Sequence, residues 1–273
     1  MIEELKEIKD RLKKNPIYAL SLGSRELFHS NLLGWIFEQY PDFLQAIYSG
    51  PIPEGITVQR EKSNFDLLIE FPEQSSLAAI IVELKIKDVP RADQLEGYTE
   101  KLRRLFPETK RVKRVLVSLA PINGSVEASK NWERIELQRL GESILGVAKE
   151  ANVTDTDAVI IKEYADLCLD LGRLWKLISL HDDGLRCFFL PFQDHSEQVE
   201  RVDSIAEELR FADTLNKNRA SALSYAIEKE CDDLLFGRLK SNFAFGFSRK
   251  TPHTDASITW CDEKNPDIAL TLS

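Results

Sequence analysis

The sequence has few cysteines and no long apolar run. Its 4 cysteines are widely separated along 273 residues and form no Cys-x-x-Cys pair, so a zinc site or a disulfide framework has little support. It contains no run of about 18 uncharged apolar residues and no basic start followed by an apolar segment. Neither a membrane span nor a signal peptide is indicated, and we expect a cytoplasmic protein without a membrane partner.

An excess of positive charge is also missing. Lys and Arg number 36 against 45 Asp and Glu, which gives a formal net charge of −9. This balance argues against a protein that coats nucleic acid through its overall charge, although a local basic patch can still guide such a substrate. Hydrophobic residues make up 43% of the chain, which is enough to build a core and argues against general disorder.

One apolar, β-branched stretch, residues 77–87, predicts a buried strand that two opposite charges interrupt. Glu83 and Lys85 share one face of this strand because side chains alternate, while Leu84 faces the other way. Burying either charge without a partner is strongly unfavourable. The pattern therefore indicates mutual pairing, a metal ion or water in an active-site cleft. From this strand alone, a partly buried ion pair at a strand end explains the two charges equally well.

Polar residues on both sides of this strand extend the pattern. Asp66 lies in an expected strand at 64–70, which a short turn would place antiparallel to the strand of Glu83. Gln94 and Tyr98 have the i, i+4 spacing of one helix face on the segment that follows. We therefore expect these polar groups to gather near one place.

Two short helices are expected earlier in the chain. Residues 2–14 predict an amphipathic helix, and a second helix at about 24–39 begins after the N-cap candidate Ser24. Glu26 and His29 lie at the edge of the apolar side of this second helix. Glu26 is either a site residue or a surface glutamate stabilised by the helix macrodipole. A lone histidine in such a place more often packs in the core than binds a metal.

These polar residues follow one another in the order of a known motif set: Glu26, Asp66, Glu83-x-Lys85 and Gln94-x-x-x-Tyr98. This order resembles the PD-(D/E)XK nuclease superfamily, and the Gln-x-x-x-Tyr element resembles its RecB-like and Cas4-like branches. The resemblance covers roughly residues 20–120 and implies an αβββαβ core. The expected elements agree with that order: helix 24–39, strands 56–62, 64–70 and 77–87, helix 91–106 and strand 112–119. Phe65 stands where the family has proline.

The resemblance implies hydrolysis of phosphodiester bonds, most simply in DNA, by a nuclease that uses Mg²⁺ or Mn²⁺. Both an endonuclease and an exonuclease fit this resemblance, and so does RNA as the substrate. Hard cations of this kind favour oxygen ligands. The implied metal ligands are Asp66, Glu83, the Leu84 carbonyl and Glu26, with His29 as an extra ligand. Lys85 would orient or help deprotonate the attacking water, Gln94 would position Lys85 or the substrate, and Tyr98 would contact the phosphate backbone.

Residues 99–114 carry a local positive excess, with seven Lys and Arg against two Glu. Lys101, Arg103 and Arg104 are candidates for phosphate contacts that position a nucleic acid without reading its sequence. A solvated, salt-bridged surface is the alternative explanation of the same residues.

The remaining chain changes character after the predicted core. We expect an α/β fold with a mixed sheet, in which a nuclease-like core and its N-terminal helix occupy residues 1–125. Long helical patterns at about 127–150, 157–180 and 197–235 predict a helical region over 126–240. Alternating segments predict a small antiparallel sheet at 241–273.

Three classes of function follow from these patterns. The first is an active nuclease of bacterial or phage DNA metabolism or defence. The second is a catalytically silent nuclease-like domain that binds nucleic acid or serves in assembly. The third is mainly an interaction protein, in which the helical half and the final sheet meet a protein partner or a second copy of the chain.

Overall fold

The computed structural model describes residues 2–21, 26–90, 92–106, 111–121, 131–181, 204–215, 217–218, 237–248, 251–262 and 269–272. The chain divides into two compact units, residues 1–179 and 180–273. All residues predicted for the active site belong to the first unit.

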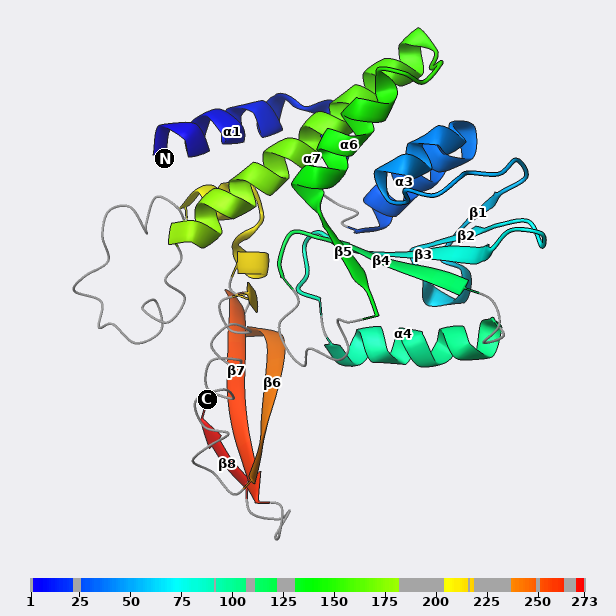
Figure 1. The fold of residues 1–273 in the computed structure, drawn as a ribbon. Coiled ribbons are helices and arrows are strands. Elements are labelled where there is room, and N and C mark those ends of the chain that lie inside the picture. Colours follow the sequence, from blue (N-terminus) through cyan, green and yellow to red (C-terminus); the bar gives the residue numbers. More distant parts are fainter. Residues whose placement is uncertain are drawn as a thin grey trace. The chain divides into compact units, whose positions relative to one another are not determined.

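A five-stranded mixed sheet forms the centre of the first unit (Figure 1). Its strands lie in chain order: β1 (Thr57–Arg60), β2 (Leu67–Glu70), β3 (Leu77–Lys85), β4 (Arg111–Ser118) and β5 (Glu133–Glu136). The pairs β1–β2 and β2–β3 are antiparallel, whereas β3–β4 and β4–β5 are parallel. The expected α/β class with a mixed sheet is confirmed.

The prediction of a continuous helix over residues 127–150 is wrong, because residues 133–136 form strand β5. Residues 133–136 pair with 115–118 of β4, and helix α6 (Leu137–Ala148) begins only after them. β5 is an edge strand in which Ile135 alone is buried. Such a strand has almost no alternating apolar pattern, so its pairing with β4, rather than its local sequence, makes it extended.

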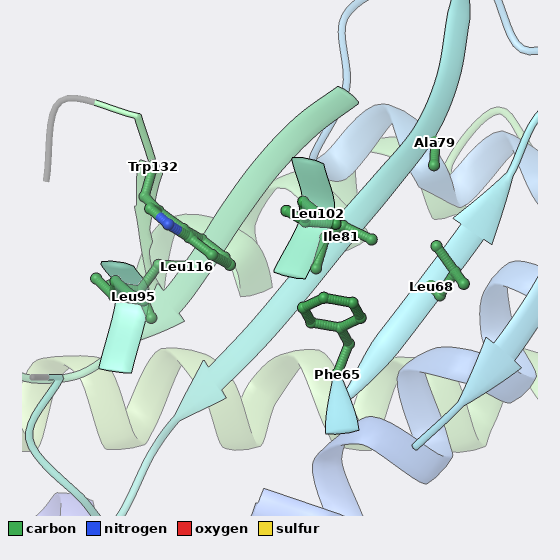
Figure 2. Close-up of a cluster of buried hydrophobic side chains, with 8 residues drawn as sticks. All are labelled: Phe65, Leu68, Ala79, Ile81, Leu95, Leu102, Leu116 and Trp132. Atoms are coloured by element: carbon green, nitrogen blue, oxygen red, sulfur yellow. The ribbon is translucent and has the colours of Figure 1, made fainter. Parts of the chain in front are cut away.

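Helices cover both faces of this sheet (Figure 1). Helix α4 (Ala92–Leu105) lies on one face, and α3 (Glu26–Gln39), α6 and the 3₁₀ helix η1 (Pro41–Ala46) lie on the other. Between α4 and the sheet is a cluster of buried hydrophobic side chains, shown in Figure 2: Phe65, Leu68, Ala79, Ile81, Leu95, Leu102, Leu116 and Trp132. This cluster fixes α4 against β3 and β4.

The predicted N-terminal amphipathic helix is confirmed as α1 (Ile2–Lys14), which is followed by the short α2 (Pro16–Ser21). The guanidinium of Arg11 donates hydrogen bonds of 2.7 to 3.1 Å to the carboxylate of Asp170 on α7 (Asp155–His181). Asn15 donates a further bond of 2.9 Å to the Glu163 carbonyl of α7. These bonds join the N-terminal helices to α7. Cys168 of α7 is a free cysteine and is buried.

The second unit contains a three-stranded antiparallel sheet in the order β6–β7–β8, with β6 at Gly237–Ser248, β7 at Thr251–Asp262 and β8 at Ala269–Leu272. This confirms the predicted terminal sheet, although β6 begins before residue 241. Of the helical pattern predicted at 197–235, the described part is helical at 204–208 and 212–215 and breaks at Arg210, whose φ is 56°. Within the described ranges, no helix is both long and apolar enough to cross a bilayer.

Helices α6 and α7 approach closely at a glycine. A Cβ atom added at Gly141 would lie 2.7 Å from the Ala165 carbonyl oxygen and 3.0 Å from the Cys168 Cβ atom of α7. Gly146, in the same helix, has no atom within 4 Å of such a Cβ and is exposed. The two glycines of α6 therefore have different roles.

We expect opposite effects from alanine at these two positions. Gly141→Ala forces α6 away from the α7 backbone and should lower the free energy of unfolding by about 1–3 kcal/mol. Gly146→Ala adds helix propensity at an open position and should raise it by up to about 1 kcal/mol. Urea unfolding followed by circular dichroism measures both values. A shift of the same sign in the two variants would contradict this packing.

Candidate active site

The register of the sheet brings Asp66 and Glu83 together. Leu67 of β2 pairs with Val82 of β3, so the next positions along the two strands are Asp66 and Glu83. The Leu84 backbone N–H donates a 2.7 Å hydrogen bond to Oδ2 of Asp66. The Asp66 carboxylate is therefore held beside the strand segment that carries Glu83 and Lys85, as the sequence predicted.

The loop before Asp66 has an unusual backbone. Glu61, Ser63 and Asn64, in and beside the 3₁₀ helix η2 (Lys62–Asn64), have φ values of 54°, 58° and 60°. Non-glycine residues in this left-handed region carry a conformational cost, and they are found more often at functional sites. Phe65 follows, is fully buried and packs its ring 5.5 Å from the Tyr98 ring. The buried ring anchors this strained loop and so fixes the position of Asp66.

Three side chains converge on one oxygen of Glu83. The Lys85 ammonium lies 2.8 Å from Oε1, and the Tyr98 hydroxyl donates to the same atom at 3.3 Å. Gln94 Nε2 donates to the Tyr98 hydroxyl at 2.9 Å and lies 3.4 Å from Oε1 of Glu83. The i, i+4 spacing on α4 thus places Gln94 and Tyr98 on the face that meets the end of β3.

The other oxygen of Glu83 is not satisfied. Oε2 is buried and has no hydrogen-bond partner among the described residues. Glu83 as a whole is 2% exposed, so water cannot replace the missing partner freely. An unpaired buried carboxylate oxygen is costly and calls for a further interaction, such as a cation.

Glu26 joins the same site from α3, where it is the first helical residue. Its Oε1 accepts a hydrogen bond of 3.3 Å from the Lys87 backbone N–H, just beyond the end of β3. It is partly buried, and its charge interacts with those of Lys85 and Asp66. This placement favours a site residue over a solvated surface glutamate. The predicted N-cap Ser24 lies outside the described residues.

Burial raises the pKa of every carboxyl group in this cluster. For Glu83, burial and the neighbouring Asp66 charge raise the pKa from 4.5 to about 7, against the opposing effect of Lys85. Burial is also the main cause of the raised pKa values of Asp66 and Glu26. Burial lowers the pKa of Lys85, but the charge of Glu83 and their hydrogen bond outweigh it and the net shift is upward. Lys85 is therefore cationic at neutral pH.

The charge balance of the cluster suits a hard divalent cation. Three carboxylates against one ammonium leave a net charge of −2 when all are ionised, and a buried oxygen of Glu83 needs a partner. Among the described side chains, no three His, Cys, Asp or Glu residues form a ready-made metal-binding group. One oxygen of each of two carboxylates already has a partner, Lys85 at Glu83 and the Leu84 N–H at Asp66.

His29 lies outside this hydrogen-bond network. Its Nδ1 atom is 3.3 Å from the Tyr164 hydroxyl of α7, and its ring packs against the rings of Phe28 and Tyr164. Burial lowers the pKa of His29 to about 3, so the ring is neutral. The contacts of His29 are those of a core residue that joins α3 to α7, and a metal-binding role for it stays a prediction.

The basic side chains of α4 differ in their contacts and exposure. Lys101 lies on the same helix face as Gln94 and Tyr98, and its ammonium is 5.6 Å from the centre of the Phe65 ring. Arg103 is exposed and pairs with Glu100 at 2.9 Å. Arg104 is also exposed. Among these three basic residues of α4, Lys101 is the one that contacts Phe65, the neighbour of Asp66 in the chain.

Two further acids near the site did not stand out in the sequence. The charge of Asp88 raises the pKa of Glu26, and the charge of Glu61 raises the pKa of Asp66, each as a smaller cause than burial. Both lie in loops that carry no apolar pattern, so periodicity did not indicate them. The sequence signal that could have identified Asp88 is its position, three residues after Lys85.

We expect the raised pKa of Glu83 to make the protein less stable as pH rises. Between about pH 4.5 and 7 the folded state holds a proton that the unfolded state has released, so the free energy of unfolding falls across this interval and levels off above it. The fall should be on the order of 1–3 kcal/mol. Glu83→Gln should reduce this fall to the part that the raised pKa values of Asp66 and Glu26 contribute, while the exposed Glu96→Gln should leave it unchanged. Urea titrations at several pH values measure the slope, and an unchanged slope in Glu83→Gln would contradict the assignment.

Comparison with known proteins finds no relative of this chain. No family model matches the chain, and no curated protein or solved structure is detectably similar to it. The function must therefore be argued from the carboxylates, the lysine and the tyrosine at the end of β3.

Proposed function

We propose that this protein is a metal-dependent nuclease that hydrolyses phosphodiester bonds, most simply in DNA. Lys85 and Tyr98 both contact a single oxygen of Glu83, and the Asp66 carboxylate accepts a hydrogen bond from Leu84, which lies between Glu83 and Lys85 in β3. This arrangement carries the proposal. The order α3–β1–β2–β3–α4–β4, with antiparallel β1 to β3 and a parallel β4, supports the resemblance to the PD-(D/E)XK core.

The carboxylate cluster is the part of the site that suits Mg²⁺ or Mn²⁺. Asp66 and Glu83 would hold the cation, together with the Leu84 carbonyl and Glu26. The unpartnered Oε2 atom of Glu83 supports this assignment. When bound, such a cation polarises the phosphate and lowers the pKa of a coordinated water.

Lys85 would act on the charge that develops during hydrolysis. In the reaction, the oxygen of water forms a bond to phosphorus, the bond from phosphorus to the leaving sugar oxygen breaks, and that oxygen takes up a proton. The raised pKa of Lys85 opposes a role as general base at neutral pH. Its ammonium instead suits orientation of the water and stabilisation of the negative phosphate oxygens.

Gln94 and Tyr98 would position this machinery. Gln94 donates to the Tyr98 hydroxyl, which in turn donates to Glu83, so the pair holds the carboxylate in one orientation. A phosphate in the site would meet the Tyr98 hydroxyl next to Lys85. Lys101, on the same face of α4, would contact the nucleic-acid backbone, and the exposed Arg103 and Arg104 would add weaker contacts further along. A cytoplasmic role in bacterial or phage DNA metabolism or defence fits this activity.

One observation favours a second candidate function, a catalytically silent nuclease-like module that binds nucleic acid or serves in assembly. The Glu83–Lys85 pair already neutralises one buried carboxylate, at a distance of 2.8 Å. A pair of this kind can be retained for structural reasons alone. Catalysis and metal binding separate the two candidates.

We expect the wild-type protein to cut DNA only when Mg²⁺ or Mn²⁺ is present. Lys85→Ala and Asp66→Ala should each lower the cleavage rate by about 100-fold or more, because they remove charge stabilisation and a metal ligand. A panel of supercoiled, linear and single-stranded DNA and RNA, with EDTA as the metal-free condition, measures this and identifies the substrate.

The matched controls come from an exposed ion pair on α7. Lys162 and Asp166 form a 2.6 Å salt bridge at the surface, so Lys162→Ala and Asp166→Ala should cleave at the wild-type rate. Activity that survives in Lys85→Ala, or that falls equally in these controls, would overturn the catalytic assignment.

Direct metal binding is a separate prediction. Isothermal titration with Mn²⁺ should show saturable binding to the wild-type protein and at least about tenfold weaker binding to Asp66→Asn, which keeps the shape of the side chain but loses its charge. Binding without cleavage of any substrate would favour the silent module. Absence of both would leave the cluster as a structural ion pair.

A further inference from the structure

A cavity lies at the end of the β3–β4 pair that is opposite to the carboxylate cluster. It has a volume of about 480 Å³ and is lined by Leu77 and Arg111, where the parallel strands β3 and β4 begin. Glu83 lies six residues further along β3, which corresponds to roughly 20 Å. The cavity is therefore separate from the site proposed for hydrolysis.

The cavity is positively charged in an otherwise acidic chain. Of the described residues that line it, Arg111, Lys113 and Arg114 are cationic, and Glu133 is acidic. Glu133 pairs with Lys113 at 2.6 Å, so three cations less one anion leave a net charge of +2. Burial lowers the pKa of Arg114, the nearby Arg103 charge lowers it further, and no acidic side chain among the described residues opposes this shift.

Two lining residues carry buried donors without acceptors. Neither Nε of Arg114 nor Nε1 of Trp132 has a hydrogen-bond partner within the described part of the chain. Trp132 is 4% exposed, and Figure 2 shows its indole at one edge of the hydrophobic cluster that packs against α4. Leaving such an N–H group unpaired costs about 1–3 kcal/mol. Both atoms are buried, so a ligand in the cavity would meet the partly exposed remainder of the Arg114 side chain and not these two atoms.

We infer that this cavity binds the phosphate group of a nucleotide. A phosphate offers several acceptor oxygens to the arginine side chains that line the cavity and a negative charge that balances the excess of +2. A bare ion would fill little of the cavity, whose volume lies within the range of about 300–1,000 Å³ typical of small-molecule sites. A free mononucleotide and the 5′-phosphorylated end of a nucleic-acid strand present the same group. The inference stands on this cavity alone and does not depend on the proposed nuclease activity.

Isothermal titration of the full chain in metal-free buffer tests the site. We expect saturable binding of deoxyadenosine 5′-monophosphate at one site, weaker binding of inorganic phosphate and no binding of deoxyadenosine. Tighter binding of a 5′-phosphorylated oligonucleotide than of its 5′-hydroxyl form and of the mononucleotide would identify a strand end as the source. Equal affinity for the nucleotide and the nucleoside would overturn the inference, as would the absence of saturable binding.

Variants locate the binding within the cavity. Arg114→Gln removes the charge and should weaken nucleotide binding at least about tenfold. Trp132→Phe keeps the aromatic packing and loses only the buried Nε1, so it should bind the nucleotide nearly as the wild type does. Arg139→Gln, an exposed arginine of α6, is the charge-matched control and should bind as the wild type does. Thermal unfolding confirms that each variant is folded, and unchanged affinity in Arg114→Gln would overturn the assignment.

Discussion

The burial of the Glu83 carboxylate at the end of an apolar strand is the constraint on which the first unit depends. β3 is almost entirely buried, and a charge within it is tolerated only with partners. Lys85 supplies the opposite charge from the same strand face, and α4, which packs on that face, supplies Tyr98 and Gln94. The strand therefore needs α4 in one rotational position, which the buried leucines of that helix also enforce.

The parallel pairing of β3 with β4 gives the sheet two chemically different ends. The acids Asp66 and Glu83 lie where β3 ends, whereas Arg111 and Arg114 lie where β4 begins. Helix α4 returns the chain from one end to the other, and this places Lys101 near the acids and Arg103 near Arg114. A basic run that is continuous in sequence is thus divided between two places, because a helix spreads its residues along its length and around its axis.

The elements outside the sheet support the position of Glu26. Glu26 begins α3, whose His29 meets Tyr164 of α7 in a buried contact. α7 is in turn joined to α1 by the Arg11–Asp170 ion pair. The close approach of α6 to α7 at Gly141 completes this layer. The N-terminal and central helices therefore brace the helix that delivers the third acid.

The sequence by itself determined the elements with strong periodicity and the residues they place side by side. Alternation along 77–87 and the i, i+4 spacing of Gln94 and Tyr98 are local properties, so the strand, the helix and the gathering of these residues with Asp66 were predictable. The tertiary structure alone decided that β5 is a strand, that Oε2 of Glu83 lacks a partner among the described residues and that Arg114 and Trp132 share a cavity. These features depend on contacts between segments far apart in the chain, and no periodicity within either segment encodes them.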